Sequence, residues 1–404
     1  MTTESAKTFS PSERAVLGVF SLGHLCNDWA VGAIWLIAPA MALAFDLGPT
    51  EVGLLITVYG IGAAFAYIPA GLAADRRADV GGLLVATFWW VAVGHIVASV
   101  MPGYWSFVAV MALAVMGDAA WHPIATGYLV RRFPKRRAQV LGIHAMGGTV
   151  GAEVLAPLAV GAVLTVFDWR VALQVAVIPA LVMGITFALL RHRLRPVAVE
   201  IGHKTDLAGL IRPWLRMSGR RLAVTMILYN MSVIGMVSML PLYLARDVSL
   251  SPMVVAVIFA ATLLAGSLLQ AWVGALTDRH GRSKLVFSGL ILGGSAAVCG
   301  AFAIAPSNGL SPFVAIAALV IAIATLTAIR SAFLASAVEV VDGRESATLA
   351  LAFTVLDGVG ALGALLAGIA GEGDLSYAFA LCGLLSLAAI VSAERSKSRQ
   401  PAYN

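Results

Sequence analysis

Long apolar stretches alternate with short polar or Gly- and Pro-containing breaks along almost the whole chain. A helix that crosses a bilayer needs about 20 mostly apolar residues, and twelve segments meet this requirement. These segments are residues 15–45, 51–74, 81–101, 104–130, 138–167, 169–190, 222–244, 252–277, 285–305, 311–335, 346–370 and 375–393. The pattern therefore predicts an all-α integral membrane protein with twelve transmembrane helices.

The composition supports lipid as the solvent of this chain. Of its 404 residues, 60% are hydrophobic and 12% are charged, whereas soluble domains carry roughly 25% charged residues. The net charge is +6, but the basic residues form short clusters between the apolar stretches. This distribution sets membrane orientation and does not build a nucleic-acid-binding face, so we expect a lipid bilayer as partner and no nucleic acid.

The basic clusters fall on one side of the predicted membrane. One alternate set of loops contains the basic segments 76–77, 131–137, 191–221 and 279–284. On the opposite side the only Lys or Arg residues are Arg170 and Arg246. Basic loops face the cytoplasm. We therefore expect a multi-pass protein of the cell inner (plasma) membrane with both termini in the cytoplasm. We also expect it to function as a monomer.

One long polar stretch interrupts the apolar pattern. Residues 191–221 divide the chain into two predicted six-helix bundles, residues 1–190 and 222–393, and residues 394–404 form a cytoplasmic tail. Within this linker, residues 207–217 fit either an amphipathic helix on the inner leaflet or a simple basic tether.

The two halves repeat each other. The loop after the second span reads GLAADRR and the loop after the eighth reads GALTDRHGRSK, with Asp75 and Asp278 in matching places, 203 residues apart. At the same offset Asn27 matches Asn230, and at an offset of 208 His122 matches Arg330. Weak internal symmetry of this kind is typical of transporters, and it predicts two pseudo-symmetric bundles.

The Gly-x-x-x-Asp-Arg-x-Gly-Arg-Arg pattern of these loops closely resembles the signature of the major facilitator superfamily. It is nearly complete in the second copy and ends Ala78-Asp79 in the first. The resemblance implies that Asp75 braces one half against the other, with Arg131 or Arg132 as its partner. It gives the same gating role to Arg76, Asp278, Arg279 and Arg282. The alternative is a cytoplasmic turn whose charges reach water.

Few ionisable residues fall inside the apolar segments. A charge at the bilayer centre costs roughly 2.5–3.5 kcal/mol on insertion scales, so such residues usually face a cavity. His24 and Asp28 lie four residues apart on the first span, and Asp118 and His122 repeat this spacing on the fourth. Each pair shares a helix face. A carboxylate beside an imidazole stabilises the protonated imidazole, so we predict that these four residues couple transport to protons.

In a fold of the major facilitator type, spans one, four, seven and ten line the central cavity. We therefore predict that five residues on these spans bind the substrate: Asn27, Trp121, Tyr229, Asn230 and Arg330. Arg330 either holds an anionic group of the substrate or neutralises an acid within the protein.

The remaining membrane acids and the metal chemistry leave alternatives. Glu153 and Asp357 lie on spans five and eleven, where gating contacts and structural ion pairs are both common. His24, Asp28 and His122 form a donor set that suits Zn or Fe, but we favour protons and expect no metal and no cofactor. The sequence contains no HExxH, nucleophile elbow or phosphate-binding loop, so we do not expect an enzyme.

Several strings resemble the fosmidomycin-resistance branch of the major facilitator superfamily: SLGHLCND, WHPIATG, MGGTVGAEVLAPL and GALTDRHGRSK. The resemblance implies a proton-driven exporter with His24, Asn27, Asp28 and His122 in its cavity. The chain departs from that pattern by adding the charges Asp118, Glu153, Arg330 and Asp357, which favour a polar or anionic substrate.

These observations together predict a secondary active transporter that works by alternating access, a proton-coupled efflux antiporter for a small polar or anionic compound or drug. A symporter that takes up an organic anion or a metal chelate is the first alternative. A non-transporting membrane sensor on the same scaffold is the second.

Overall fold

Helices make up nearly all of the described chain. The computed structural model describes residues 9–76, 79–134, 136–194, 207–305, 308, 310–338, 340 and 351–393. Its first half contains α1 (Pro11–Ala44), α2 (Pro49–Arg76), α3 (Val80–Ser99), α4 (Tyr104–Arg132), α5 (Arg137–Thr149), the π-helical turn η1 (Val150–Leu155), α6 (Ala156–Leu164), α7 (Trp169–Ala176), α8 (Ile178–Leu190) and the short 3₁₀ turn η2 (Arg191–Arg193).

The second half has the same character. It contains α9 (Leu207–Leu215), α10 (Met217–Arg246), α11 (Pro252–His280), α12 (Arg282–Ile304), α13 (Pro312–Ala328), α14 (Arg330–Val338), a second π-helical turn η4 (Thr354–Val359), α16 (Leu362–Ala370) and α17 (Leu375–Ser392). Helix α9 lies where the sequence fits an amphipathic helix, and α10 starts at Met217, inside the predicted linker.

Eleven helical stretches of the described chain are long and apolar enough to cross a membrane. They correspond to eleven of the twelve predicted spans, some of them built from two or three consecutive helices. The remaining span, predicted at residues 346–370, begins outside the described residues and continues through η4 and α16. The prediction of an all-α, multi-pass membrane protein is confirmed.

The outer surface of the helices is apolar. Large side chains such as Phe65, Trp105 and Phe313 are more than two thirds exposed. Exposed apolar surface of this extent is rare on soluble monomers and is expected where lipid surrounds the protein.

Helix ends are fixed by short polar side chains at the starts of several spans. Ser10 and Glu13 form a reciprocal capping box around Pro11 at the start of α1. The carboxylates of Asp79, Asp168 and Asp374 accept backbone N–H groups at the starts of α3, α7 and α17. Caps of this kind satisfy the free amides of a helix N-terminus.

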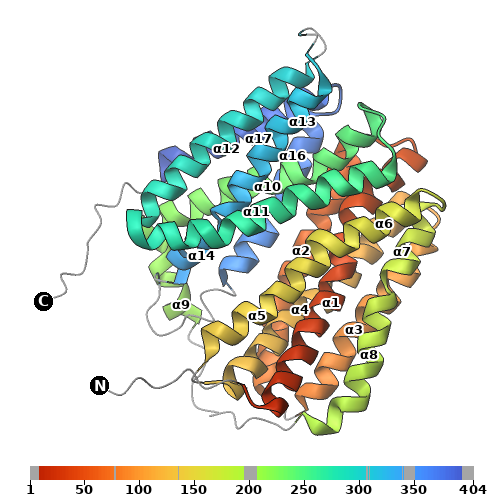
Figure 1. Cartoon of the computed structure of the whole chain (residues 1–404), viewed down its shortest axis with the longest axis vertical. Helices are drawn as coiled ribbons and strands as arrows, with labels where there is room; N and C mark the ends of the chain where they lie inside the picture. Colours follow the sequence, from red (N-terminus) through yellow and green to blue (C-terminus); the bar gives the residue numbers. More distant parts are fainter. Residues whose placement is uncertain are drawn as a thin grey trace, which may run out of the picture.

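The helices form two groups that cross each other (Figure 1). Helices α1–α8 fill the lower right of the view and α10–α17 the upper left. Between the groups, α2 packs against α16 and η4, and α11 packs against α6 and η1. Because spans two and eleven pair in the same way as spans five and eight, the contacts between the halves follow the internal repeat.

Small residues bring the two halves into backbone contact at one end of the molecule. A Cβ atom added to Gly53 would lie 2.2 Å from the carbonyl oxygen of Ala364, and one added to Gly368 would lie 2.3 Å from that of Pro49. Thr57 donates a hydrogen bond to the carbonyl of Ala361 at 2.7 Å. These residues lie near the start of α2 and in or just before α16, so this end of the interface is closed.

Polar contacts extend the same closure to the loops. The hydroxyl of Thr50, in the first turn of α2, donates to the carboxylate of Glu372, in the turn after α16. The backbone N–H of Thr50 donates to the same carboxylate oxygen at 3.1 Å. One acidic side chain of the second half thus caps the start of a helix in the first half.

Candidate functional site

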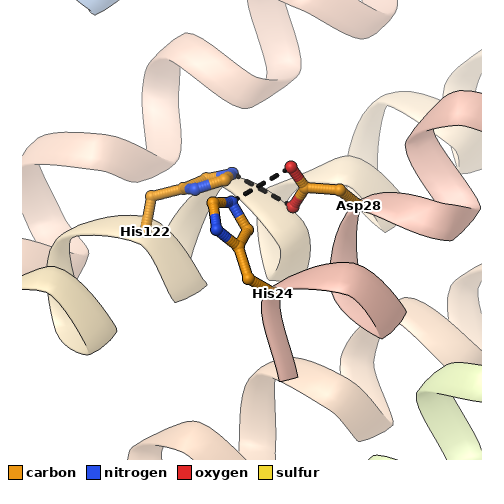
Figure 2. A group of neighbouring side chains, drawn as sticks. All are labelled: His24, Asp28 and His122. Carbon is orange, nitrogen blue, oxygen red and sulfur yellow. Dashed lines mark ion pairs between the residues drawn. The ribbon is translucent and has the colours of Figure 1, made fainter. Parts of the chain in front are cut away.

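The pairs predicted on spans one and four come together in the first half. His24, Asn27 and Asp28 lie on α1, and Asp118 and His122 lie on α4. Figure 2 shows the side chains of His24, Asp28 and His122 pointing toward one another from two helices. Because both pairs have a spacing of four, each helix presents its acid and its imidazole on the same face.

Asp28 contacts both imidazoles. One of its carboxylate oxygens lies 3.1 Å from Nε2 of His24, and the other lies 3.7 Å from Nε2 of His122. The same His122 nitrogen lies 3.6 Å from a carboxylate oxygen of Asp118. The order of contacts is therefore His24, Asp28, His122, Asp118, with acids and imidazoles alternating.

A single amide connects the two acids. The side-chain N–H₂ of Asn27 donates a short hydrogen bond to the carboxylate of Asp118. It also lies 3.2 Å from Oδ1 of Asp28. Asn27 is fully buried, so both carboxylates are oriented by a side chain that carries no charge of its own.

The tautomer of His24 follows from its second contact. Its Nδ1 lies 2.8 Å from the backbone carbonyl oxygen of His144 on α5, and a carbonyl oxygen can only accept a hydrogen bond. Nδ1 therefore carries a proton, and Nε2 is the nitrogen that faces Asp28. The rings of His24 and His144 are stacked, with centroids 4.2 Å apart.

A glycine leaves room for the contact between His24 and Asp28. A Cβ atom on Gly148 of α5 would lie 2.6 Å from Nε2 of His24 and 2.7 Å from Oδ2 of Asp28. Any larger residue at this position would displace the two groups. His144 and Gly148 were not among the predicted site residues, and only the spacing of four between them on span five hints that both face α1.

Exposure differs sharply within the cluster. The side chain of His122 is 29% exposed, compared with 17% for Asp28, 11% for His24 and 7% for Asp118. His122 is therefore the most exposed of the four side chains.

The same side chains offer metal-ligand atoms. One ligand atom each from His24, Asp28 and His122 lies within 4.8 Å of the others. Two imidazole nitrogens and a carboxylate oxygen suit Zn or Fe, so the chemistry of these donors fits protons and a divalent transition metal alike.

The substrate residues predicted on the second half are engaged elsewhere in this conformation. Tyr229 is buried and its hydroxyl donates to the carbonyl of Leu326 at 2.8 Å. Asn230 donates to the carbonyl of Leu356 at 2.7 Å. Arg330 begins α14 and is partly exposed.

Trp121 packs into the interior of the first half. Its ring is fully buried and contacts the aromatic rings of Phe20, Phe88 and Phe187, with centroids 4.9–6.0 Å away. In this conformation the ring supports α4 from inside the first half.

The predicted gating residues separate into two groups. Glu153, in η1, accepts a hydrogen bond from the hydroxyl of Ser267 on α11, in the opposite half. Ser267 was not predicted, because nothing in its local sequence marks it. Asp357 lies in η4, but its side chain is outside the described part of the chain.

The signature-loop residues lie at helix ends. Asp75 and Arg76 close α2, and Asp278 and Arg279 lie in the last turn of α11. The side chains of all four are outside the described part of the chain. Arg131 lies in the last turn of α4, and Arg282 begins α12. The partnership predicted between Asp75 and Arg131 stays a prediction.

Membrane-spanning helices in two repeated halves, with buried acids and imidazoles between two of the spans, define a polytopic membrane transporter. The family model of the Major Facilitator Superfamily matches residues 20–266 and 222–402. The chain therefore belongs to the Major Facilitator Superfamily, as the signature loops predicted.

The chain is similar in sequence to other transporters over part of their length. The chain is 26% identical over 178 residues to a "Hexuronate transporter" of Bacillus subtilis (strain 168), covering 44% of this chain and 42% of that protein. It is 28% identical over 152 residues to a "Probable sugar efflux transporter" of Haemophilus influenzae (strain PittGG), covering 37% of each. The matches thus span less than half of these relatives.

Solved structures resemble the whole chain. A bacterial homologue of the human lysosomal transporter Spinster, in an inward-facing and unoccupied conformation, has a TM-score of 0.76 at 18% identity, covering 96% of this chain and 95% of that one. The nucleoside transporter NupG has a TM-score of 0.73 at 13% identity, covering 94% of this chain and 100% of that one. At these identities the likeness shows the fold. Since relatives and fold neighbours are transporters, the expectation that the chain is not an enzyme is confirmed.

Proposed function

We propose that this transporter couples the movement of a small polar or anionic compound to protons, as an efflux antiporter. The observation that carries the proposal is the alternating contact of His24, Asp28, His122 and Asp118 across α1 and α4. Two acids and two imidazoles in contact titrate as one unit, because a proton on any member changes the charge that its neighbours experience.

The proton-binding atoms follow from the hydrogen bonds. Nε2 of His24 is the exchanging nitrogen, since its Nδ1 donates to a carbonyl. His122 lies between two carboxylates and is the most exposed member of the cluster. A proton entering through His122 passes to Asp28, which lies in contact with both imidazoles.

The interface between the halves supports alternating access. The described contacts of Gly53, Thr57 and Gly368 close one end. The positive-inside rule assigns this end to the outer side of the inner (plasma) membrane, with both termini in the cytoplasm. We therefore assign the structure to an inward-facing state of two six-helix bundles, residues 1–190 and 222–393, acting as a monomer.

Arg330 is our candidate for binding the substrate. It is the one basic residue of the predicted spans that the sequence places in the C-terminal cavity wall, and its side chain is partly exposed. A guanidinium recognises carboxylate or phosphate groups. The name of the relative from Bacillus subtilis points in the same direction, since a hexuronate is a sugar acid. We therefore propose an organic anion with hydroxyl groups as the substrate class, contacted also by Tyr229 and Asn230 once their present hydrogen bonds are released.

Export is the direction that we favour. The fosmidomycin-resistance resemblance of SLGHLCND and WHPIATG implies it, and one relative is named for sugar efflux. The alternative is uptake of an organic anion or a metal chelate by symport, which the hexuronate relative favours. Asp75, Arg76, Arg131, Asp278, Arg279 and Arg282 keep their proposed gating role in either direction.

Proteoliposomes with an imposed pH gradient distinguish these functions. With protons more concentrated on one side of the membrane, antiport drives a sugar acid toward that side and symport drives it away. A panel of sugar acids and matched neutral sugars tests the role of Arg330. Solute binding without any flux in either gradient would replace the transporter by the sensor alternative.

A further inference from the structure

The internal repeat extends to two breaks in helical geometry. The π-helical turns η1 and η4 begin at Val150 and Thr354, 204 residues apart, and each has six residues. Each carries an acid at its fourth position, Glu153 in η1 and Asp357 in η4. Isolated π turns are rare and occur frequently at functional sites, so a symmetric pair with matching acids points to a shared task.

Both π turns face the opposite half. Turn η1, in the first half, packs against α11 of the second, and η4, in the second half, packs against α2 of the first. Each turn therefore lies on the boundary that must rearrange when the two halves rock against each other.

Turn η1 is held firmly by its own half. A Cβ atom on Gly32 of α1 would lie 2.2 Å from the carbonyl oxygen of Ala152, and one on Gly151 would lie 2.2 Å from that of Leu25. With α1 and η1 in backbone contact, the position of Glu153 is fixed relative to α1. Any change in the distance from Glu153 to α11 reports a movement of the second half.

The carboxylate of Glu153 makes a hydrogen bond across the boundary between the halves. It accepts the hydroxyl of Ser267 on α11. The charged groups that act on it are Arg330 of α14, which attracts its negative charge, and Asp28 of α1, which repels it. A hydrogen bond to an ionised group is stronger than one between neutral groups, so an ionised Glu153 holds α11 more tightly than a protonated one.

We propose that Glu153 is a further coupling residue, a proton-sensitive contact on the π turn that links the first half to Ser267 of the second. Ionised Glu153 stabilises the contact with α11, and a proton on Glu153 weakens it, so that the halves separate at this face. Glu153 acts by positioning α11 and does not need to touch the substrate. The inference rests on the proposed alternating access but not on the identity of the substrate.

The test measures the distance between the halves directly. Spin labels at Val166, after α6, and Leu310, before α13, report opening of the closed end; both positions are exposed. The protein is full-length, in lipid nanodiscs without substrate, with its three cysteines replaced by alanine. Distance distributions are recorded by pulsed electron paramagnetic resonance from acidic to alkaline pH.

The wild type is expected to open as the pH falls. Glu153→Gln keeps the shape and the hydrogen bond but cannot ionise. It should raise the open-to-closed ratio at alkaline pH by roughly fivefold, the difference between a charge-assisted and a neutral hydrogen bond, and should flatten the pH dependence. Ser267→Ala removes the hydrogen bond but keeps an ionisable carboxylate that the charge of Arg330 attracts, so it should raise the same ratio while leaving part of the pH dependence.

Two controls decide the result. Glu372→Gln removes the other described carboxylate that joins the halves, at Thr50, and should leave the pH dependence in place. Asp28→Asn should stop proton-linked transport while the distances still respond to pH, so failure of the proposed transport and failure of this contact are separable. A Glu153→Gln protein with the wild-type pH profile, or a profile abolished by Glu372→Gln alone, overturns the assignment.

Discussion

Asn27 and Asn230 occupy matching places in the internal repeat, 203 residues apart, but their amides bind different groups. Asn27 donates to the carboxylate of Asp118 on α4, whereas Asn230 donates to the backbone carbonyl of Leu356 in η4. In the first half the amide orients a titratable acid. In the second half it satisfies a carbonyl within the π-helical turn, which is one known way of stabilising a break in a helix. The repeat is thus symmetric in fold and asymmetric in chemistry.

This asymmetry predicts that the residues that bind the coupled protons lie in the first half. Asp28→Asn removes the carboxylate between two imidazoles while keeping its size, so proton-linked transport in proteoliposomes should be abolished and the unfolding temperature should change little. Asp374→Asn is the matched control, since Asn caps a helix as well as Asp does and Asp374 caps α17. Unchanged pH dependence of transport in Asp28→Asn would show that the coupling residues lie elsewhere.

Space at Gly148 should be as necessary as the charges. Gly148→Ala forces a Cβ atom against Nε2 of His24 and Oδ2 of Asp28, so we expect a loss of about 1–3 kcal/mol of stability and a loss of proton-linked transport. Gly142→Ala, on the same helix with no atom within 4 Å of the added Cβ, should stabilise by about 0.5–1 kcal/mol. Detergent unfolding curves and a transport assay on both variants provide the comparison. Equal behaviour of the two variants would contradict the close contact.

The closed end should open when its glycine contacts are filled. Gly368→Ala places a Cβ atom 2.3 Å from the carbonyl of Pro49, and a backbone oxygen cannot move aside as a side chain can. We expect thiol reagents to modify a reporter at Thr57→Cys several-fold faster in this background, because Thr57 is buried at the same interface. Gly373→Ala, with nothing within 4 Å, should leave the modification rate unchanged. A slow reporter in both backgrounds would argue that α2 and α16 shift without separating.

Asp79 should make a small contribution to stability that disappears in acid. A hydrogen bond from Arg191 is the main cause that lowers the pKa of this carboxyl, and the N–H of Gly82 at 2.7 Å adds to it. A lowered folded-state pKa means that the stabilisation is complete above the ordinary pKa of an Asp and is lost as the pH falls through the lower folded value. Asp79→Ala should cost about 1 kcal/mol near neutral pH, the value of a helix N-cap.

Arg191→Gln separates the two contributions of Asp79. The ion pair is about half exposed on both sides, so water and salt screen it, and this variant should destabilise less than Asp79→Ala. Chemical unfolding in detergent at neutral and acidic pH checks both effects. An Asp79→Ala penalty that persists in acid would show that packing, and not the charge, makes the contribution.

The sequence predicted some of the contacts in the site but not all of them. Spacing alone placed His24 with Asp28 and Asp118 with His122, because residues four apart share a helix face. No local pattern reported that α1 and α4 bring the two pairs within 4 Å of each other, or that Asn27 connects the acids. His144, Gly148 and Ser267 were missed for the same reason: each matters through a partner more than 100 residues away in the sequence.

The sequence by itself determined the membrane, the spans and the repeat. The length of the apolar segments, the scarcity of charge and the two signature loops each depend on local composition, and the solvent imposes them on every residue alike. Only the tertiary structure decided which polar groups meet. Contacts among His122, Asp28 and Asp118, and the contact from Glu153 to Ser267, depend on how helices distant in sequence cross and on which end of the two halves is closed. Helix packing sets these distances, and the hydrophobic pattern of a membrane span, apolar on nearly every face, carries little information about its neighbours.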